Sequence, residues 1–532
     1  MPDQVVIFSG KVGSGKTTLA ELLVQSFGVH LFKTRTFLKA RAKEISLERR
    51  ALQEFGEHLD KQTGGAWVQK DLQAATEELS ANAVIALDAV RMLGQVEAIR
   101  RAYGRRVFHV HLDASDKELA RRYKARPVNE IKELPNYADV QLNKTERNVP
   151  KLEKIADVVI RTDRCTPQDV LIRVASHLGL YGREYVRLVD VLVGGQYGSE
   201  GKGQVCAYLA PEYDLLIRVG GPNAGHKVYE VPRPYAFHQL PSGTRVSEAK
   251  ILIGAGAVIN VDTIMREAAE CQVGKDRLFI DPQAMIIDKR DIASEVGLTA
   301  RIGSTGQGVG SATARRIKRG TDVRLAKDIK VLKPFLREGQ EILENAFRQR
   351  SRIFLEGTQG TGLSLYHGNY PHVTSRDTTV AGCLAEAGIS PTRVRKVIMV
   401  CRTYPIRVQD GTKGTSGPMT SPITWEDVAK RSGYSAAKLK ETELTTTTKR
   451  ERRVAEFDWQ LLRKVATLNA PTDIALTFVD YFSTANTHAR RFEQLTPETI
   501  RFIEEVEKVA STPVTLISTR FHSRGIIDRR MW

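Results

Sequence analysis

Two stretches of this 532-residue chain share one pattern: an apolar run, then a glycine-rich turn, then a run that favours a helix. The first apolar run is at residues 5–8 with its turn at 10–18, and the second is at residues 188–193 with its turn at 194–203. Such a pattern is typical of the first strand and helix of a parallel α/β sheet. Each occurrence therefore predicts the start of a separate α/β domain, and a chain of this length is expected to hold about two to four domains.

Between the two turns, apolar strands alternate with amphipathic helices. The predicted strands are residues 84–87, 107–112 and 158–160, and the predicted helical stretches are residues 116–125, 150–156 and 167–178. Residues 179–187 are the expected linker. We therefore predict an N-terminal domain of residues 1–184 and a C-terminal domain of residues 185–532.

The composition excludes several classes of protein. A hydrophobic fraction of 41% and a charged fraction of 27% are ordinary for a globular protein with large cores. The apolar runs are too short or too rich in glycine to cross a bilayer, and the N-terminus lacks the pattern of a signal peptide. Five scattered cysteines without metal-ligand spacing fit reduced thiols. We expect a cytoplasmic protein without membrane contact.

The chain is strongly basic, with a formal net charge of +18. Nucleic-acid binding and a set of pockets for small anions both fit such a charge. The basic residues are spread along the chain, with short clusters at residues 315–319 and 449–453 and with no basic tail. This distribution favours anionic small substrates over nucleic acid.

The first turn matches the phosphate-loop pattern G-x4-G-K-[ST] at residues 10–17. Its glycines allow backbone N–H groups to surround a phosphate, and they are Gly10, Gly13 and Gly15. Lys16 would neutralise the β- and γ-phosphates, and Thr17 would bind Mg²⁺. The following helix would add a favourable dipole. A purely structural glycine turn is the less favoured alternative, because the full pattern lies between a predicted strand and a predicted helix.

The rest of the N-terminal domain resembles small P-loop proteins of the nucleoside-monophosphate-kinase-like type. Asp88 ends a predicted strand, Arg91 follows it, and Arg121, Arg122 and Arg126 belong to or follow the helix predicted next. In such proteins the aspartate serves the metal or the acceptor, and lid arginines hold the transferred phosphoryl group. Two alternatives stay open: Arg121 and Arg122 form a solvated helix face, or the domain binds nucleotide without turnover.

A series of motifs rich in glycine, histidine or threonine follows the second turn in a fixed order. They lie at residues 194–203, 221–226, 239–243, 303–310, 356–361, 367–374, 445–453 and 477–480. Through these motifs, residues 186–530 resemble adenylosuccinate synthetase, in the compact form of archaea and phages. One glycine turn is weak evidence, but this many in register are specific. The resemblance implies an α/β domain with a large central sheet, so the expected fold class is α/β throughout, with the parallel sheet of a P-loop NTPase first.

The resemblance also implies a reaction: aspartate is joined to the 6-oxo carbon of a purine nucleoside monophosphate at the expense of GTP or ATP. The 6-oxo oxygen is a poor leaving group until it is phosphorylated, after which the amine of aspartate can displace phosphate. One site must therefore collect a triphosphate, a monophosphate, a dicarboxylate and Mg²⁺. Their combined negative charge explains a pocket rich in lysine, arginine and backbone N–H groups.

Roles of single residues follow from the matched motifs. Lys202 would bind the β- and γ-phosphates together with the glycines of its turn, which are Gly198, Gly201 and Gly203. Gly225 would offer its carbonyl oxygen to Mg²⁺, and His226 would act as a general acid at the phosphorylated oxygen. A buried structural histidine is the alternative for His226.

Other matched positions concern the two remaining substrates and the oligomer. The residues expected to hold the monophosphate are Asn223, Thr305, Gln359 and Thr374, and we also count Gln359 as catalytic. Arg319 matches an arginine that reaches the neighbouring subunit's nucleotide site, which implies a homodimer; a plain surface charge is its alternative.

Arg450 and Arg452 would lie in a loop that closes on aspartate, since a guanidinium can hold a carboxylate through two parallel bonds. The hydroxyls of residues 445–448 would assist, unless this is only a solvated loop. Asp480 would accept hydrogen bonds from guanine if the donor is GTP.

Ser199 departs from the family, whose aspartate at this position removes the N1 proton of IMP and binds Mg²⁺. A serine hydroxyl is not ionised near neutral pH and cannot do this unaided. One explanation is a resemblance to the branch that makes 2-aminoadenylosuccinate from dGMP, where a small side chain leaves room for the 2-amino group. A second is IMP as the acceptor with another group as the base, and a third is binding without catalysis. We keep Ser199 among the candidate catalytic residues.

Further departures concern the triphosphate and the amino acid. Phe478 replaces a lysine that is common beside the guanine-binding aspartate, and residues 519–521 replace the usual Thr-Gly-Pro, so an adenine nucleotide also fits. Lys449 and Glu451 interrupt a run that is usually glycine and arginines, so the amino acid could differ from aspartate. The sequence leaves IMP, GMP and dGMP open as acceptors.

Three hypotheses follow, and we favour an active ligase that carries a fused ATP-binding domain. The second is a nucleotide-sensing protein that has lost its base, and the third is a nucleotide kinase with the ligase domain as a scaffold. The fusion suggests that the two domains process one nucleotide in sequence.

Overall fold

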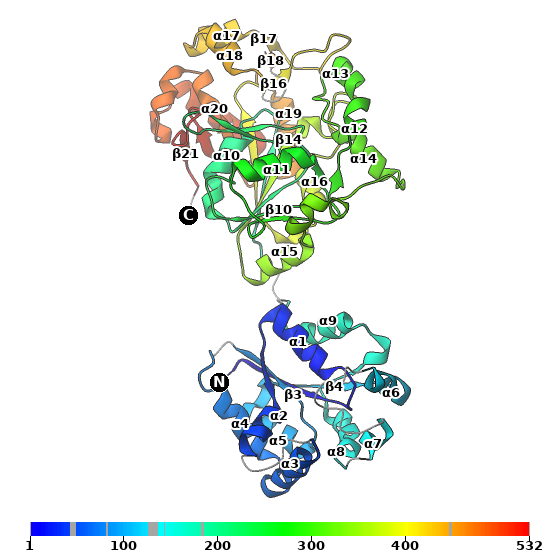
Figure 1. Cartoon of the computed structure of the whole chain (residues 1–532). Coiled ribbons are helices and arrows are strands. Elements are labelled where there is room, and N and C mark those ends of the chain that lie inside the picture. The colour runs from blue at the N-terminus through cyan, green and yellow to red at the C-terminus, as the bar shows by residue number, and fades with distance from the viewer. Residues whose placement is uncertain are drawn as a thin grey trace. The chain divides into compact units, whose positions relative to one another are not determined.

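The computed structural model describes residues 2–42, 49–80, 83–125, 137–142, 144–181, 186–445 and 450–530. Contacts divide the chain into two compact units, Met1–Arg183 and Glu184–Trp532 (Figure 1). Arg126, Lys449 and residues 446–448, which the sequence marks as candidates, lie outside the described residues. Of the helices in the described part, none is long and apolar enough to cross a membrane.

The described part of the N-terminal unit forms a five-stranded sheet in the order β2-β3-β1-β4-β5, and all neighbouring strands are parallel. Its strands are β1 Gln4–Ser9, β2 His30–Lys33, β3 Val84–Asp88, β4 Val107–Asp113 and β5 Val158–Arg161. Its helices are α1 Lys16–Phe27, α2 Thr34–Arg41, α3 Arg49–Thr63, α4 Ala66–Ala75, α5 Leu93–Tyr103, α6 Asp116–Lys124, α7 Tyr137–Gln141, α8 Lys144–Asn148 and α9 Pro167–His177.

The strands and helices predicted for this unit are present, and the unit also contains elements that were not predicted, namely β2 and the helices α2–α5, α7 and α8. The four apolar runs are strands, and the helical stretch predicted at residues 150–156 is a 3₁₀ helix, Val149–Ile155, rather than an α-helix. β2 has no apolar pattern that would predict it, because this edge strand is polar at both ends and none of its residues is buried. An edge strand needs less apolar surface than the central strands, which are covered on both faces.

The described part of the C-terminal unit contains a nine-stranded sheet in the order β12-β10-β7-β14-β6-β15-β19-β20-β21. All its neighbouring pairs are parallel except β20 with β21. The nine strands are β6 Val189–Gly194, β7 Leu215–Arg218, β10 Lys250–Ile253, β12 Leu278–Ile280, β14 Ile353–Gly360, β15 Val394–Arg402, β19 Asp473–Thr477, β20 Val514–Ser518 and β21 Ile526–Asp528.

Three small sheets and a set of helices complete this unit. The small sheets pair β8 His226–Val228 with β9 Tyr235–Phe237, β11 Val258–Ile259 with β13 Met285–Ile286, and β18 Arg452–Ala455 with β16 Ile406–Val408 and β17 Pro422–Ile423. The α-helices are α10 Lys202–Leu209, α11 Val261–Glu270, α12 Lys289–Ser294, α13 Val296–Ile302, α14 Val309–Ile317, α15 Gly339–Arg348, α16 Val380–Ala387, α17 Trp425–Ser432, α18 Ala436–Thr442, α19 Trp459–Asn469 and α20 Pro497–Ala510.

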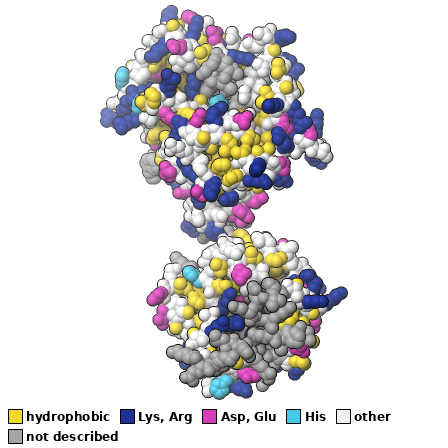
Figure 2. Space-filling model, in the orientation of Figure 1, with side chains coloured by type: hydrophobic (Ala, Val, Ile, Leu, Met, Phe, Trp, Pro, Cys, Tyr) yellow, Lys and Arg dark blue, Asp and Glu magenta, His cyan; other side chains and the backbone are white. Residues whose placement is uncertain are grey.

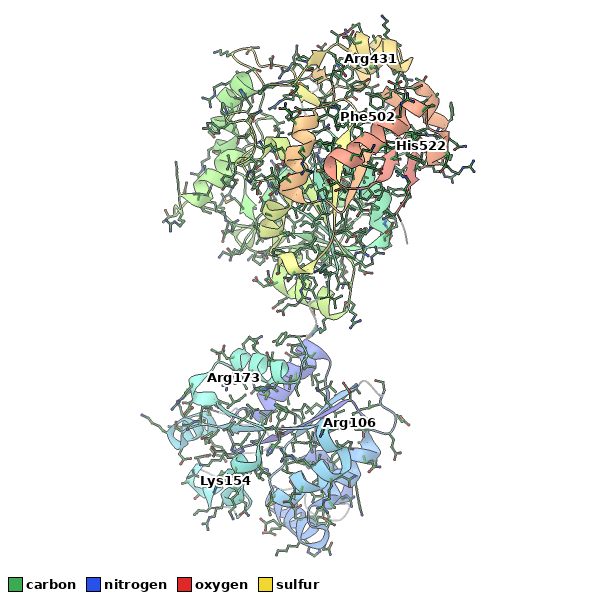
Figure 3. All side chains as sticks on the ribbon, turned by 180° about the vertical axis from the view of Figure 1, so that it is seen from behind. Arg106, Lys154, Arg173, Arg431, Phe502 and His522 are labelled. Atoms are coloured by element: carbon green, nitrogen blue, oxygen red, sulfur yellow. The ribbon has the colours of Figure 1, made fainter. Side chains whose placement is uncertain are left out.

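Both faces of the large sheet are buried, which is why its strands are apolar without alternation. Val191 and Val193 belong to a core on one face, to which α16, α19 and α20 contribute, whereas Leu192 belongs to a core that includes α10 on the other face. Seen from behind, Phe502 lies on α20 in the C-terminal unit (Figure 3), and its ring centroid is 5.0 Å from that of Phe457. The α/β fold class predicted for both units is confirmed.

Candidate residues gather where the parallel strands end. The turns that leave the carboxyl ends of β6, β7, β14, β15 and β19 carry most of the motifs found in the sequence. Ligands of open parallel sheets bind at this edge. In Figure 1, α17 and α18 lie at one end of the unit and α15 at the other; α15 precedes β14 and so marks the amino ends of the strands.

Candidate functional site

Both glycine-rich turns end in the same way, with a left-handed glycine followed by the first residue of a helix, which is a lysine. Gly15 has φ 97° before Lys16 of α1, and Gly201 has φ 83° before Lys202 of α10. A residue with a Cβ is strained at such angles, so glycine is required here. The geometry places a lysine and several backbone N–H groups at a helix N-terminus, where an anion is favoured.

A buried ion pair holds the turn after β6. The ammonium of Lys202 donates to Glu200 Oε2 at 2.6 Å and to the carbonyl of Gly198 at 3.1 Å, and both side chains are fully buried. The N–H groups of Gln196 and Gly198 donate to Glu200 Oε1 at 3.0 and 2.7 Å. Burial alone would raise the pKa of Glu200, but Lys202 and these N–H groups keep it below its usual value. The turn is therefore fixed before any ligand binds.

His226 is held at both ring nitrogens. Nδ1 lies 2.5 Å from Glu356 Oε1, and Nε2 lies 2.9 Å from the carbonyl oxygen of Thr358. Burial, and then the neighbouring Arg218, lower the pKa of His226, while the Glu356 carboxylate favours its protonated form. An imidazole that is buried, oriented by a carboxylate and next to a carbonyl oxygen can pass a proton to an oxygen atom.

Glu356 is the centre of this cluster. Its carboxylate accepts from Arg218 Nη1 at 3.3 Å and from the N–H and hydroxyl of Ser242 at 2.7 and 2.6 Å. Burial opposes ionisation, but Arg218 and His226 hold the pKa of Glu356 at about 2. The carboxylate therefore stays charged and orients His226.

Of the residues expected to hold a monophosphate, Gln359 lies next to Thr358, whose carbonyl oxygen contacts His226. Gln359 follows Thr358 on β14. Its Nε2 is buried and has no hydrogen-bond partner among the residues that the structure describes, and the same is true of Oδ1 of Asn223. Thr374 lies on the loop after β14, where its N–H donates to the carbonyl of Leu363 at 2.8 Å. A Cβ on Gly203 would lie 2.9 Å from Cβ of His226, so the α10 turn also borders this group. Lys202, His226 and Gln359 are thus brought to one edge of the sheet.

Ser199 is half-buried in the α10 turn, and its carbonyl oxygen accepts from Arg402 Nη1 at 3.2 Å. Arg402 is 1% exposed, contacts the face of Phe478 at 4.0 Å, and donates through Nη2 to Glu443 at 3.0 Å. Glu443 also accepts from Arg452 at 3.1 Å and from Tyr481 at 2.7 Å. These charges hold the pKa of Glu443 at about 2 against the effect of its burial.

Arg450 and Arg452 therefore lie in different settings. Arg452 begins β18 rather than lying in the loop, and its guanidinium pairs with Glu443. The N–H of Arg450 donates to Thr445 Oγ1 at 2.8 Å and the N–H of Thr445 donates back to the carbonyl of Arg450 at 2.8 Å. These two bonds close the base of the segment between Thr445 and Arg450.

Asp480 lies just beyond β19 and is buried. The Tyr434 hydroxyl donates to its Oδ2 at 3.0 Å. Burial raises the pKa of Asp480 to about 7. Phe478 is close to the phosphate turn, because a Cβ on Gly201 would lie 3.3 Å from its ring. The arrangement provides an acidic hydrogen-bonding group and an aromatic face next to the α10 turn.

Thr305 and Arg319 flank α14. Thr305 is half-buried in the glycine-rich segment before the helix, and the N-terminal N–H groups of Gly308 and Gly310 donate to Glu295, each at 2.8 Å. A Cβ on Gly310 would lie 3.2 Å from Ser375, next to Thr374. Arg319 is exposed beyond the helix, and in the described part of the chain its side chain makes no hydrogen bond or ion pair to the other candidates.

In the N-terminal unit, residues of the first phosphate loop line a cavity of about 800 Å³. Lys16 donates to the carbonyls of Gly10 and Lys11 at 2.7 and 2.9 Å. Thr17 Oγ1 donates to Asp88 at 2.9 Å. The paired hydroxyl and carboxylate are oxygen ligands of the kind that Mg²⁺ prefers.

The two helix arginines that the sequence left undecided differ from each other. Arg121 is exposed and pairs with Glu118 on its own helix, which is the solvated face. Arg122 also pairs with Glu118 but donates to the carbonyl of Gly13 in the phosphate loop at 3.3 Å and to Thr162 at 2.9 Å. Arg122 therefore fixes the loop, and both arginines border the cavity.

Sequence reasoning missed the polar and charged partners that hold these groups. Some could have been found, because Glu200, Ser242 and Glu356 lie inside the motifs. Arg402 and Glu443 stand in ordinary sequence, and only the fold brings them together. The searched residues of the described ranges contain no cluster of three or more His, Cys, Asp or Glu that could hold a metal ion.

Comparisons with known proteins agree with this geometry. A model of the adenylosuccinate synthetase family matches residues 191–327 and 323–487, and a model of an AAA domain matches residues 6–150. The adenylosuccinate synthetase of Methanocaldococcus jannaschii is 37% identical over 348 residues, which are 64% of this chain and 96% of that protein. That of Pyrococcus horikoshii is 38% identical over 348 residues, which are 64% of this chain and 98% of that protein.

Two solved structures share the fold of the C-terminal unit. The succinoaminodeoxyadenylate synthetase of cyanophage S-2L, bound to dGMP and dATP, has a TM-score of 0.54 and 24% identity, over 65% of this chain and 96% of that one. The fully ligated adenylosuccinate synthetase of Plasmodium falciparum has a TM-score of 0.55 and 22% identity, over 64% of this chain and 100% of that one.

The fold together with these comparisons defines an α/β enzyme of the ligase class with a P-loop, kinase-like domain at its N-terminus. The chain belongs to the adenylosuccinate synthetase family.

The Glu443 cluster gives a prediction of stability. Glu443→Gln would leave two buried guanidinium groups without their carboxylate, so we expect a loss of about 3–5 kcal/mol in the free energy of unfolding at pH 7. Because the folded-state pKa of Glu443 is about 2 and its ordinary value is 4.5, this stabilisation is present above about pH 4.5 and is lost as the pH falls toward 2. The difference between the variant and the unaltered protein should shrink over that range, as measured by urea unfolding.

Glu426→Gln is the matched control, because Glu426 forms an exposed pair with Lys440. We expect it to change stability by less than about 1 kcal/mol. Equal effects of the two variants would contradict a structural role for the buried cluster.

Proposed function

We propose that the C-terminal unit condenses aspartate with a 6-oxopurine nucleoside monophosphate at the expense of GTP or ATP, through a 6-phosphoryl intermediate. The observation that carries this is the setting of His226, oriented by Glu356 and adjacent to the unpartnered amide atoms of Gln359 and Asn223. Buried polar atoms without partners need an explanation, and a nucleotide that fits between them is one. Lys202 would stabilise charge on the transferred phosphoryl group.

The reaction would proceed by two displacements. Lys202 and the N–H groups of its turn would orient the triphosphate. The 6-oxo oxygen attacks the γ-phosphorus, the nucleoside diphosphate leaves, and the N1 proton of the purine passes to water. His226 gives a proton to that oxygen as the amine of aspartate attacks carbon 6, and inorganic phosphate leaves. Arg450 is our candidate for holding a carboxylate of aspartate, because Arg452 is paired with Glu443. Asp480 is our candidate for the base of the triphosphate.

Mg²⁺ fits both units on the chemistry of their oxygen atoms. In the ligase unit the protein would offer neutral oxygens, the carbonyl of Gly225 and the hydroxyl of Ser199, so that the substrates supply the anionic ligands. In the N-terminal unit Thr17 and Asp88 would hold it. The ion would neutralise charge on the phosphates.

A homodimer belongs to this proposal. Arg319 is exposed beyond α14, and in the proposed dimer it would reach the nucleotide site of the neighbouring subunit. Hydrophobic side chains gather in the middle of the visible face of the C-terminal unit, with lysines and arginines around them (Figure 2). We also propose that the enzyme is cytoplasmic and acts on nucleotides rather than nucleic acids.

The acceptor nucleotide is tested by a ligation screen with aspartate, GTP or ATP, and IMP, GMP or dGMP, followed by mass spectrometry of the succinyl product. We expect product, with GMP or dGMP preferred over IMP, because Ser199 leaves room for a 2-amino group and supplies no base for N1. Ser199→Asp should shift the ratio of kcat/KM values toward IMP by about tenfold or more, since a carboxylate is ionised at neutral pH. No product from any combination would end the proposal, whereas an unchanged ratio would remove Ser199 from it.

The role of His226 has its own test. His226→Gln should lower kcat by about 10²–10⁴-fold, the usual contribution of a general acid, with little change in the affinity for the monophosphate. His238→Gln is the control, because His238 is a partly exposed histidine whose partner is Glu267. Steady-state kinetics and calorimetry separate the two effects, and a fall in affinity alone would argue for a structural histidine.

A second candidate function, phosphoryl transfer to a nucleoside monophosphate, is favoured by the cavity of the N-terminal unit. The phosphate loop lies among its lining residues together with Arg35, Arg91, Trp67 and Asp60. Asp60 accepts from Trp67 Nε1 at 2.7 Å and from Gln95 Nε2 at 3.0 Å, and burial raises its pKa. Arginines suit the phosphate of an acceptor, and an aromatic wall with a carboxylate suits a base that carries N–H groups.

The kinase activity is measured by transfer of the γ-phosphoryl group of ATP to a panel of nucleoside monophosphates. Lys16→Ala should lower this transfer by about 10²-fold or more while ligation is unchanged, because Lys16 belongs to the other unit. Lys39→Ala, at an exposed position of α2, is the control. The absence of transfer to every monophosphate by the unaltered protein would leave the N-terminal unit as a binding domain.

A further inference from the structure

The wall beside His226, formed by Thr358, Gln359 and Arg376, contains an arginine that is almost completely buried. Arg376 is 8% exposed and lies on the loop after β14, two residues beyond Thr374. Its Nε donates to Glu386 Oε1 at 2.7 Å and its Nη1 donates to Thr358 Oγ1 at 2.6 Å. Its Nη2 is buried and has no hydrogen-bond partner in the described part of the chain.

The hydrogen bonds of this wall run in one direction. A guanidinium can only donate, so the Thr358 hydroxyl must accept from Arg376 and pass its own proton on. That proton goes to Gln359 Oε1 at 2.6 Å. The amide orientation of Gln359 is thereby fixed, with Nε2 as its remaining donor, and this Nε2 is also buried without a partner. Two N–H donors from groups that share Thr358 therefore lack an acceptor.

The missing partner must accept hydrogen bonds and should be negative. An unsatisfied buried donor costs about 1–3 kcal/mol, more when it is charged, and arginine cannot lose its proton to escape this cost. An anionic oxygen within reach of a guanidinium forms one of the stronger hydrogen bonds in proteins. The chemistry of the wall is therefore that of a phosphate or carboxylate subsite.

A glycine and a glutamate hold Arg376 in this position. Gly220 has φ +87°, and a Cβ there would lie 2.2 Å from Arg376 Nη1 and 2.7 Å from Thr358 Oγ1, so only glycine permits the approach. The N–H of Gly220 donates to Glu386 Oε2 at 3.1 Å. Glu386 thus joins Arg376 to the start of the turn that carries Asn223 and His226.

Among the anions of the proposed reaction, one is not yet matched to a buried cation. The triphosphate is assigned to Lys202 and the carboxylates of aspartate to the segment around Arg450. The acceptor nucleotide is assigned to the neutral side chains of Asn223, Thr305, Gln359 and Thr374, and the one cation expected near it, Arg319, would come from a neighbouring subunit. Arg376 is a charged donor of the same subunit in the wall beside His226, and a guanidinium holds a phosphate dianion more strongly than neutral groups do.

We propose that Arg376 binds the 5′-phosphate of the acceptor nucleotide through Nη2, beside Gln359 Nε2, and so selects a nucleoside monophosphate over a nucleoside. The inference rests on the proposed ligase function for the identity of the acceptor. It assigns Arg376 as a substrate-binding residue, and Glu386 and Gly220 as the residues that position it.

The test compares the affinities of a nucleoside monophosphate and its nucleoside, GMP with guanosine and IMP with inosine, by calorimetry. The ratio of the two dissociation constants measures what the phosphate adds. In Arg376→Gln we expect this ratio to fall by about ten- to a hundredfold, with the affinity for the nucleoside nearly unchanged. Arg376→Lys should retain part of the ratio, because it keeps the charge but not the forked geometry.

Two further variants guard the result. Arg376→Gln combined with Glu386→Gln removes the carboxylate that would lose its buried cation, so that misfolding of the single variant does not hide the effect. Arg395→Gln is the matched control: it breaks the pair with Asp190 on β6, at the opposite end of the strands, and should leave the ratio unchanged.

The outcomes separate this inference from the proposed function. An unchanged ratio in folded Arg376→Gln protein overturns it. An unchanged ratio with a lower kcat also overturns it and assigns Arg376 to the 6-phosphoryl group instead. A reduced ratio in a protein that forms no succinyl product would support the phosphate subsite while the ligase reaction fails.

Discussion

Buried carboxylates hold the cations of the C-terminal unit, and the geometry of the candidate site at the carboxyl ends of its strands depends on these ion pairs. Glu200 holds Lys202, Glu356 holds Arg218 and His226, and Glu443 holds Arg402. Moving a charge out of water costs several kcal/mol, so each of these groups is tolerable only with its partner in place. The consequence is preorganisation: the donors are held in place by the folded protein, and little reorganisation would be needed during the proposed reaction. The same buried ion pairs therefore determine both the stability of the unit and the geometry of its site.

The glycine-rich turns of the two units share the same local geometry, but different groups hold the lysine in each. In each, a left-handed glycine ends the turn and a lysine begins the helix. In the N-terminal unit Lys16 donates to carbonyl oxygens of its own loop, whereas Lys202 donates to a carboxylate as well. A lysine neutralised by a neighbouring glutamate attracts phosphate less by its charge alone, so phosphate binding at the turn after β6 would depend more on the N–H groups of that turn. This contrast fits the proposal that one unit binds a single triphosphate and the other collects several anions.

The sequence predicted those parts of the molecule that depend on short local patterns. The glycine turns, the central strands and the α/β class could be recognised because their signals lie within a few neighbouring residues. The edge strand β2 could not, because it has no buried residue. Arg376 and Glu443 could not either, since a single charge in an ordinary stretch has many possible environments, and their partners lie up to 41 residues away in the hydrogen bonds described. Arg452 was placed in a loop by the motif, but the pairing of β18 with β16 makes it the first residue of a strand.

Ser199 stands apart from these clusters in one respect. Its backbone is anchored, because Arg402 donates to its carbonyl oxygen, but no charged pair of the site includes its side chain. If Ser199 faces the purine as proposed, a substitution there would change the surroundings of the purine without disturbing the ion pairs that keep the domain folded. Substitutions at this position can therefore change the nucleotide preference at little cost in stability. We expect relatives that differ in their nucleotide preference to differ here before they differ at Glu200 or Glu356.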